Sequence, residues 1–125
     1  RLVDGQGALR VALALLTNHL SLRSADGGDC ERMLQWRNDP ATRAVSADPR
    51  EIDPQTHRDW FAASLAMPTR RLWIGQVGPR PVGVLRFDFD AAAARVSIFL
   101  DPALTGLGLG TPLLACGEAR LRREQ

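Results

Sequence analysis

Apolar residues recur along the chain at two spacings, one typical of helices and one typical of strands. Near the start, Leu9, Leu13 and Leu16 lie at helical spacing, after the turn-forming segment 4–7. This spacing predicts a terminal helix over residues 7–20.

A second helical pattern follows the turn Asp26-Gly27-Gly28-Asp29. Its members, spaced i, i+3, i+4 and i+7, are Cys30, Met33, Leu34 and Arg37. Asp29 is placed to cap this helix, and Pro40 ends it because a residue before proline is disfavoured in helical conformation. We therefore expect a helix over residues 30–38.

A third helix is predicted after Asp53-Pro54, which combines an N-cap with a proline at the first helical position. Pro68 closes it, and residues 41–52 before it are polar and irregular. Its expected inward face consists of His57, Trp60, Phe61, Ser64 and Leu65.

The second half of the chain changes to strand-like alternation. A short run at 21–23 is followed by strands expected at 71–77, 82–89 and 95–100, with short turns between the last three. These strands predict an antiparallel meander. A glycine-rich loop over 101–110 and a helix over 111–123 complete the pattern.

This order of elements decides the fold class. Consecutive strands with helices before and after them indicate an α+β (mixed α/β) fold, an antiparallel-to-mixed sheet flanked by helices, rather than a doubly wound parallel sheet.

The composition excludes several classes of binding site and catalytic mechanism. All 16 basic residues are arginines, against 14 acidic residues, for a formal charge of +2. The absence of lysine excludes a Walker-type phosphate loop and a Schiff base, and leaves guanidinium groups to bind phosphates or carboxylates. The arginines alternate with acids instead of forming a basic stripe, so nucleic-acid binding is not expected.

The cysteine pattern and the length of the apolar runs argue against metal-binding, disulfide-rich and membrane-spanning proteins. Cys30 and Cys116 are far apart and have no ligand-spaced neighbours, so neither a metal site nor a disulfide framework is expected. Cys116 has no adjacent base, which favours a buried thiol over a nucleophile. No apolar run is long enough for a membrane span, and no leader sequence is visible, so we expect a cytoplasmic protein. The first residue is Arg1 and not Met, so we expect this sequence to be a piece of a longer protein.

One segment carries recognisable chemistry. Thr105-Gly106-Leu107-Gly108-Leu109-Gly110-Thr111 follows a predicted strand and opens a helix, where free amides and the helix dipole hold phosphates. The dinucleotide fingerprint fails because Thr111 replaces its last glycine. Two alternatives remain, a pyrophosphate cradle of another kind and a simple strand-to-helix connection.

The strand, loop and helix over 98–114 resemble the acetyl-coenzyme A motif of the GNAT family of N-acetyltransferases. The family's loop reads Arg/Gln-x-x-Gly-x-Gly/Ala; Gly108-Leu109-Gly110 matches its second half, whereas Thr105 replaces the usual Arg or Gln. The resemblance implies acetyl-CoA as cosubstrate and no metal.

Upstream segments extend the resemblance over about 21–123. Leu34-Gln35-Trp36-Arg37-Asn38-Asp39-Pro40 resembles a signature of the branches that acetylate amino sugar nucleotides and ribosomal proteins. His57-x-x-Trp60-Phe61 and the strands beginning at Arg71 and Pro81 resemble the segments that follow it. Residues 1–20 resemble the end of a pseudaminic acid pathway sugar-nucleotide hydrolase.

These resemblances define the expected domains. Residues 1–20 are expected to be the tail helix or linker of a preceding domain, and their resemblance implies a fused upstream hydrolase. Residues 21–125 are expected to form a GNAT-like domain that lacks the family's last strands.

The resemblance also implies site residues. Main-chain amides from Ser97, Ile98, Phe99 and Leu100 would face pantetheine and the thioester, and the segment Thr105 to Thr111 would hold the pyrophosphate. His57 is the candidate base, with a packed histidine as the alternative. Candidate acceptor-binding residues are Arg37, Asn38, Trp60 and Asp88.

Three functions follow as hypotheses. The first is N-acetylation of a small-molecule amine, with a 4-amino nucleotide sugar as the expected acceptor and surface polysaccharide or nonulosonic acid biosynthesis as the setting. The second is a non-catalytic GNAT-like appendage of a sugar-nucleotide enzyme, and the third is acetylation of protein N-termini.

Overall fold

A four-stranded sheet forms the centre of the computed structural model, which describes residues 19–124. The strands are β1 (Leu20–Ser24), β2 (Arg70–Val77), β3 (Arg80–Phe89) and β4 (Ala94–Leu100). They lie in the order β1-β2-β3-β4, and every neighbouring pair is antiparallel. The predicted meander is therefore confirmed, and β1 adds a fourth strand at its edge.

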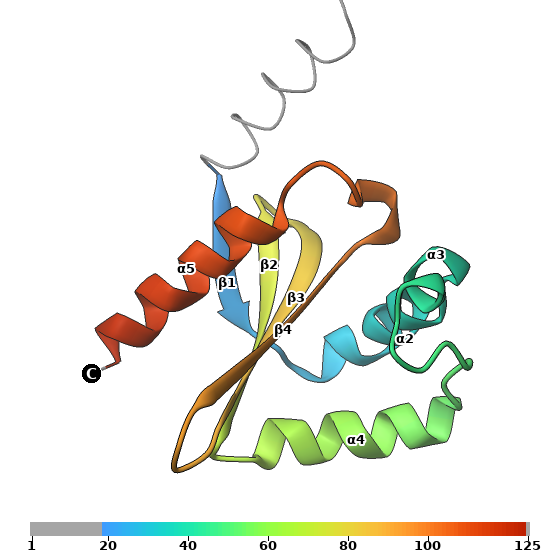
Figure 1. Cartoon of the computed structure of the whole chain (residues 1–125), viewed down its shortest axis with the longest axis horizontal. Helices are drawn as coiled ribbons and strands as arrows, with labels where there is room; N and C mark the ends of the chain where they lie inside the picture. The colour runs from blue at the N-terminus through green and yellow to red at the C-terminus, as the bar shows by residue number, and fades with distance from the viewer. Residues whose placement is uncertain (1–18, 125) are drawn as a thin grey trace, which may run out of the picture.

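Helices cover both faces of this sheet (Figure 1). They are α2 (Cys30–Asn38), α3 (Pro40–Ala44), α4 (Pro54–Ala66) and α5 (Gly110–Arg123), with short 3₁₀ turns η1 (Gly27–Asp29) and η2 (Pro102–Leu104). The α+β fold class predicted from the sequence is confirmed.

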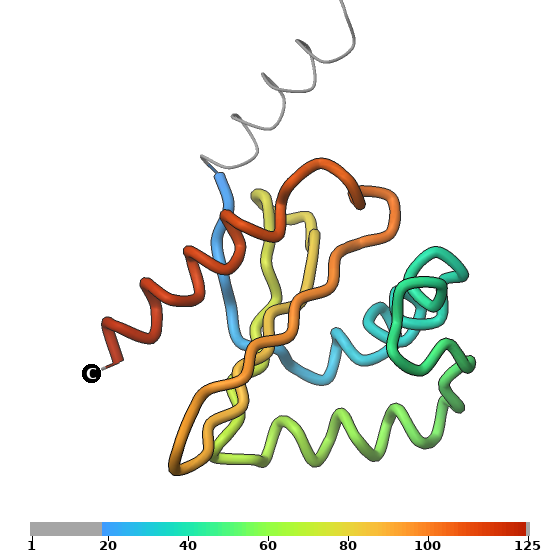
Figure 2. The backbone as a smooth tube through the Cα atoms, in the orientation of Figure 1, coloured from blue at the N-terminus to red at the C-terminus, as the bar shows by residue number. Residues whose placement is uncertain are grey.

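Tight turns fix the strand register. Val77 pairs with Arg80, so β2 and β3 are joined through two residues, of which Gly78 has a positive φ of 58°. Positive φ is easily adopted by glycine, which lacks a Cβ atom. Figure 2 shows β3 and β4 running together as a long twisted ribbon.

One core lies between the sheet and the pair α2 and α4. Its buried members are Met33, Trp36, Phe61, Leu72, Ile74 and Val84. In α4, the N-cap carboxylate of Asp53 accepts a hydrogen bond from the Thr56 amide at 3.0 Å, as Asp53-Pro54 predicts.

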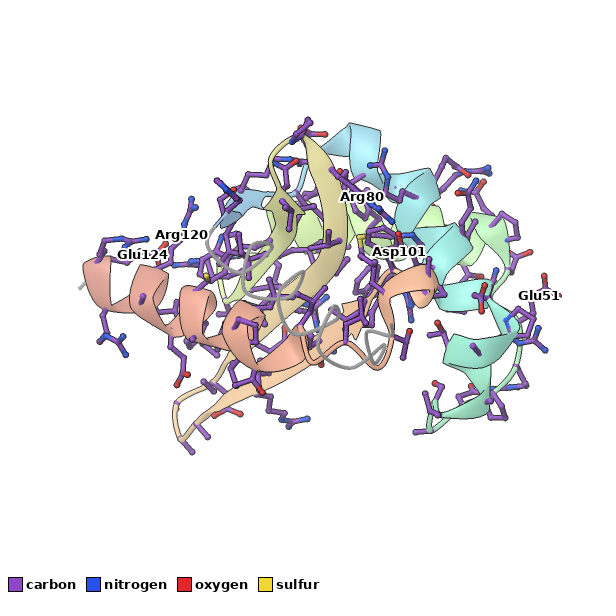
Figure 3. The ribbon with its side chains drawn as sticks, turned by 90° about the horizontal axis from the view of Figure 1, so that it is seen from above. Glu51, Arg80, Asp101, Arg120 and Glu124 are labelled. Carbon is purple, nitrogen blue, oxygen red and sulfur yellow. The ribbon has the colours of Figure 1, made fainter. Side chains whose placement is uncertain are left out.

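A second core lies between the opposite face and α5. Its buried members are Trp73, Leu85, Phe87 and Leu113. Gly117 lets α5 approach the sheet closely, because a Cβ atom there would overlap a Leu85 methyl and lie 2.9 Å from Cε2 of Phe87. Figure 3 shows α5 crossing this face, with Arg120 and Glu124 toward its end.

The start of α2 differs from the sequence-based expectation. The side chain of Asp29 makes no capping hydrogen bond to α2. It belongs to η1, where it accepts from the Asp26 amide at 2.9 Å and from both terminal nitrogens of Arg23 at 2.7 Å. This two-pronged ion pair joins η1 to β1, and the prediction of Asp29 as a cap of α2 was wrong because an extra turn precedes the helix.

Two further expectations need correction. Residues 40–44 form α3 within a segment predicted as irregular; the Asp39 carboxylate caps it through the Ala41 amide at 2.9 Å. Leu65, predicted to face inward, is 44% exposed, because α4 buries a stripe formed by His57, Phe61 and Ser64.

A terminal helix was predicted over residues 7–20. Residues 7–18 of this range lie outside the described residues, and Leu20 belongs to β1. Within residues 19–124, no helix is both long and apolar enough to cross a membrane.

Candidate functional site

A cavity of about 720 Å³ opens between the sheet and the helices that precede it. Arg37 of α2, Trp60 of α4, Arg86 of β3 and Ser97 to Phe99 of β4 contribute to its inner wall. The segment between α3 and α4 forms the outer wall. The inner wall thus brings together residues from four elements that are distant in sequence.

Trp60 is surrounded by guanidinium groups. The Cζ atoms of Arg37, Arg70 and Arg86 lie 5.0, 5.5 and 5.7 Å from the centre of its ring system. Cations near an aromatic face are attracted by its quadrupole. Trp60 was an expected acceptor-binding residue, and the structure places it on the cavity wall beside Arg37 and Arg86.

Arg86 is oriented by its own strand and by β4. Its Nη2 donates a hydrogen bond to Ser97 Oγ at 3.0 Å, and its Nε lies 2.9 Å from Asp88 Oδ2. That Nε is buried and out of line for a hydrogen bond to any described residue. The Asp88 contact is therefore an ion pair that leaves part of the donor capacity of Arg86 unused.

Asp88, expected to bind the acceptor, has its carboxylate between two arginines. Arg70 Nε donates to Asp88 Oδ1 at 2.5 Å, and Arg70 Nη1 donates to Ser64 Oγ at 2.7 Å. Asp88 does not line the cavity. It orients Arg86 on the cavity wall and Arg70 behind that wall.

Arg37 lies at the end of α2 with His57 behind it. The Arg37 Nη1 atom is 3.5 Å from His57 Nδ1, and His57 Nε2 is 2.8 Å from the Cys30 carbonyl oxygen. Because a carbonyl only accepts, Nε2 carries the proton and Nδ1 is the acceptor. Burial and the nearby charge of Arg86 lower the pKa of Arg37.

His57 is 1% exposed and does not line the cavity. Burial lowers its pKa from the ordinary value, although its hydrogen bond to the Cys30 carbonyl acts in the opposite direction. The ring is therefore neutral near pH 7, and it supports Arg37 from behind.

Asn38 tethers the outer wall. Its Nδ2 donates to the Ile52 carbonyl at 2.9 Å, and its Oδ1 accepts from the Ile52 amide at 2.7 Å. Both ends of the side-chain amide are thus engaged. Asn38, expected to contact the acceptor, shapes the cavity without lining it.

The glycine-rich loop presents main-chain donors. Gly106 and Gly108 have positive φ angles of 87° and 78°. Among residues 19–124, no acceptor is found for the amides of residues 106–109, and the Leu109 N-cap gives α5 no side-chain capping bond. Amides at a helix start form an anion site, so this loop fits the pyrophosphate of coenzyme A.

Two side chains define the shape of the loop. Leu109 is 1% exposed and anchors the loop in the core. A Cβ atom at Gly110 would meet nothing within 4 Å, so the surface there is open to a ligand. Thr105, which replaces the usual Arg or Gln, donates its hydroxyl to the Pro102 carbonyl at 3.1 Å.

Strand β4 links the cavity to the loop. Ser97, Ile98 and Phe99 line the cavity, and Leu100 ends the strand just before the loop begins. Only β3 pairs with β4 among the described residues, and alternate amides of such an edge strand point away from their partner. These amides are available for the thioester contacts expected at Ser97 to Leu100.

Sequence reasoning missed Arg70 and Arg86 as site residues. A signal was present for Arg86, because it alternates with Val84 and Asp88 on one face of a strand whose other face carries Leu85 and Phe87. A charged residue on a central strand covered on both faces needs a partner or a function. No group of three potential metal-ligating side chains exists within residues 19–124.

Several solved acetyltransferases share this architecture. One from Salmonella typhimurium, which modifies the N-terminal serine of a 50S ribosomal subunit protein, aligns over 85% of this chain and 65% of its own (TM-score 0.71, 19% identity). The chain therefore has the GNAT acetyltransferase fold.

Two other acetyltransferases illustrate the range of acceptors. Spermidine N-acetyltransferase from Vibrio cholerae, in complex with CoA and spermine, aligns over 78% of this chain and 60% of its own (TM-score 0.66, 15% identity). An aminoglycoside acetyltransferase in complex with coenzyme A aligns over 83% and 68% (TM-score 0.70, 16% identity).

The chain spans less than two thirds of the length of the spermidine and ribosomal-protein enzymes. No protein-family model matches the sequence, and no curated protein matches it. The similarity between this chain and these acetyltransferases is therefore a similarity of fold.

Proposed function

We propose that this chain is the cofactor-binding part of an acetyl-CoA-dependent N-acetyltransferase whose acceptor is a small amine. The observation that carries the proposal is the run of amides at residues 106–109, just before α5, for which residues 19–124 provide no acceptor, and β4 joins this run to the cavity. Acetyl-CoA would supply an activated acetyl thioester at this strand.

Main-chain amides of this chain are suitably placed to bind the cofactor and to stabilise the charge that develops during acetyl transfer. The amides of Leu107, Gly108, Gly110 and Thr111 would bind the pyrophosphate, with Leu109 anchoring the loop between them and the donor dipoles of α5 behind them. Outward-facing amides of β4 would donate to the thioester oxygen as negative charge develops on it during attack by the amine. The amine would have to be neutral to attack, with its ammonium proton released to water. The new N–C bond would replace the C–S bond of the thioester, and the departing thiolate would take up the second proton lost by the amine.

We propose a 4-amino nucleotide sugar as the acceptor. Guanidinium groups suit a diphosphate and an indole suits a sugar or base face, and the cavity offers Arg37, Arg86 and Trp60. Surface polysaccharide or nonulosonic acid biosynthesis remains the expected setting, and a fused upstream hydrolase and a cytoplasmic location remain predictions.

His57 has a different role in this proposal from the base expected from the sequence. Acting as the base would require its ring to leave the Cys30 carbonyl and enter the cavity. We propose instead that it positions Arg37.

A second candidate function is a non-catalytic appendage of a sugar-nucleotide enzyme. It is favoured by one observation, the Thr105 hydroxyl that is bonded within the loop and directed to the Pro102 carbonyl. Acetylation of a protein N-terminus is a third candidate, and a serine-initiated peptide belongs in the acceptor panel for this reason.

Calorimetric titration of coenzyme A into the full chain tests the cofactor site. The decisive variant is Gly110→Val, because its Cβ meets open space in the protein yet fills the surface proposed for the phosphates. We expect at least tenfold weaker binding with an unchanged unfolding midpoint, since several charge-assisted contacts are lost.

Gly27→Ala is the matched control, because a Cβ there also meets nothing within 4 Å and η1 lies apart from the loop. Equal affinities of Gly110→Val and the unchanged chain would overturn the assignment of this loop. Binding of coenzyme A without acetylation of amino nucleotide sugars, spermine or the serine peptide would favour the non-catalytic appendage.

A further inference from the structure

The cluster of side chains at and directly behind the inner wall of the cavity carries an excess of positive charge. Three guanidinium groups, those of Arg37, Arg70 and Arg86, surround Trp60, and one carboxylate, that of Asp88, lies among them. The cluster therefore has a net charge of +2. His57 behind it adds no charge while its ring is neutral.

The guanidinium groups that carry this excess charge are partly buried. The side chains of Arg70 and Arg86 are 15% and 29% exposed, and Arg37 is half-buried. Like charges at such distances repel, and burial weakens their screening by solvent. An arrangement of this kind is stabilised when an anion binds.

Arg37 has unused donors. No carboxylate of the described residues lies within ion-pair distance of it, and among them its one polar side-chain contact is the 3.5 Å approach to His57. A guanidinium group has five N–H donors. Its Trp60 contact fixes the plane of the group while the remaining donors stay free.

The acids of the outer wall do not neutralise this cluster. Asp48 is paired with Arg50 at 2.8 Å, and Asp53 caps α4. Glu51 also lines the cavity, but it is exposed and lies at the end of the molecule opposite α5, where solvent screens its charge (Figure 3). The cavity is therefore polarised, with its positive side against the sheet.

We propose that Arg37 and Arg86, placed over Trp60, form an anion subsite that selects amine acceptors carrying a phosphate or carboxylate group. The acceptor part of this inference rests on the proposed function, whereas anion binding itself does not. Because Arg86 is bonded to Ser97 on β4, the subsite lies beside the strand proposed to hold the thioester.

The subsite has a consequence for specificity. A polyamine would bring positive charge to a wall that already has an excess of it, whereas an amine with a nearby anion would neutralise that wall. We infer that acceptors such as spermine are disfavoured at this cavity.

Anion titrations followed by tryptophan fluorescence test the subsite. They are made in the Gly110→Val background, so that the loop before α5 does not compete for phosphate. The probes are inorganic pyrophosphate, glucosamine 1-phosphate and β-alanine, which separate phosphate from carboxylate recognition, with spermine as the cationic probe.

We expect saturable binding of at least one anionic probe and at least tenfold weaker binding by Arg37→Gln and by Arg86→Gln, since each removes a charged hydrogen-bond donor. Arg86→Lys keeps the positive charge but loses the planar fork of the guanidinium group. Its anion affinity is expected to lie between that of the parent and that of Arg86→Gln. Arg122→Gln is the control and should not differ from its parent, because Arg122 is an exposed residue of α5 that lies outside the cavity.

Unchanged anion affinity in both glutamine variants, or preference for spermine, would overturn the subsite. The unfolding midpoint of each variant shows whether it folds, and Arg86→Lys keeps the test informative if a glutamine variant does not. Failure of coenzyme A to bind the unchanged chain, with anions still bound, would overturn the proposed function and leave the subsite standing.

Discussion

At the scale of single residues, burial determines which atoms of a side chain are left for chemistry. His57 has both ring nitrogens engaged, one by the Cys30 carbonyl and one by Arg37. Asn38 has both ends of its amide bonded to Ile52. Arg37, in contrast, keeps donors free on the cavity wall, so it is the better candidate for ligand contact.

The histidine makes stability depend on pH. Because burial lowers the pKa of His57 in the folded chain, the unfolded chain binds more protons as the pH falls below about 6.5. We therefore expect the free energy of unfolding to decrease between pH 7 and pH 5, as measured by urea titrations at each pH.

His57→Gln should reduce this pH dependence, although it lowers stability at pH 7 by about 1–3 kcal/mol through its altered buried contacts. His19→Gln is the matched control, since His19 is exposed and should retain the dependence of the parent. An unaltered pH dependence in His57→Gln would contradict the neutral buried ring.

Several site residues were accessible to sequence reasoning, and others were not. Arg37 and Trp60 were expected from their motifs, and both line the cavity. The engagement of Asp88 by Arg70 could not be derived, because it depends on which residues the β2–β3 register places side by side: Arg70 pairs with Asp88 across the two strands.

At the scale of elements, the seating of α5 depends on a missing side chain. Gly117 packs directly on Leu85 and Phe87 of β3, and Leu113 packs similarly against Gly75 and Gly83 of the sheet. The helix that would hold the cofactor at its start is thus fixed to the sheet along its middle.

Gly117→Ala is expected to destabilise the protein by about 1–3 kcal/mol, because overpacking exceeds the gain in helix propensity of roughly 1 kcal/mol. Chemical denaturation measures the change. Glu118→Ala, at the adjacent exposed position, should stay within about 0.5 kcal/mol of the parent. A more stable Gly117→Ala would mean that α5 is less closely packed than the structure shows.

Helix α3 shows how a local signal can be overlooked. Asp39-Pro40 has the same cap-and-proline pattern as Asp53-Pro54, and both carboxylates cap the helix that follows. The polar composition of residues 41–52 favoured an irregular segment, because a five-residue helix with no buried residue has no apolar periodicity to detect.

At the scale of the whole molecule, two cores share one sheet. Trp36 belongs to the core under α2 and α4, and Trp73 belongs to the core under α5. Strands β2 and β3 contribute to both, with Ile74 and Val84 on one face and Trp73 and Leu85 on the other. The loss of either core exposes strands on which the other depends.

We therefore expect a single cooperative unfolding transition. In Trp73→Phe, tryptophan fluorescence reports on the core under α2 and α4, through Trp36 and Trp60. In the double variant Trp36→Phe, Trp60→Phe it reports on the core under α5, through Trp73. Far-ultraviolet circular dichroism reports on all elements in both variants. Within each variant the two urea midpoints should coincide. Separate midpoints would show that one layer unfolds while the other persists.

The overall architecture was largely predictable because its determinants are local. Alternating residues in β3 and β4, the Gly78 turn and the caps of α4 each act over a few positions. The face covered by each helix was not predictable, since it follows from contacts such as Gly117 on Leu85 that join distant parts of the chain.

The reciprocal bonds between Asn38 and Ile52 make the intervening segment an exchangeable module. They close its base on α2, so insertions or deletions between them alter the volume of the cavity while its anchor points stay fixed. Lengthening a closed surface loop costs little conformational entropy. Under the proposed function, related chains would diverge in acceptor through this segment, and grafting it between them, with Asn38 and Ile52 retained, would be a direct route to altered specificity.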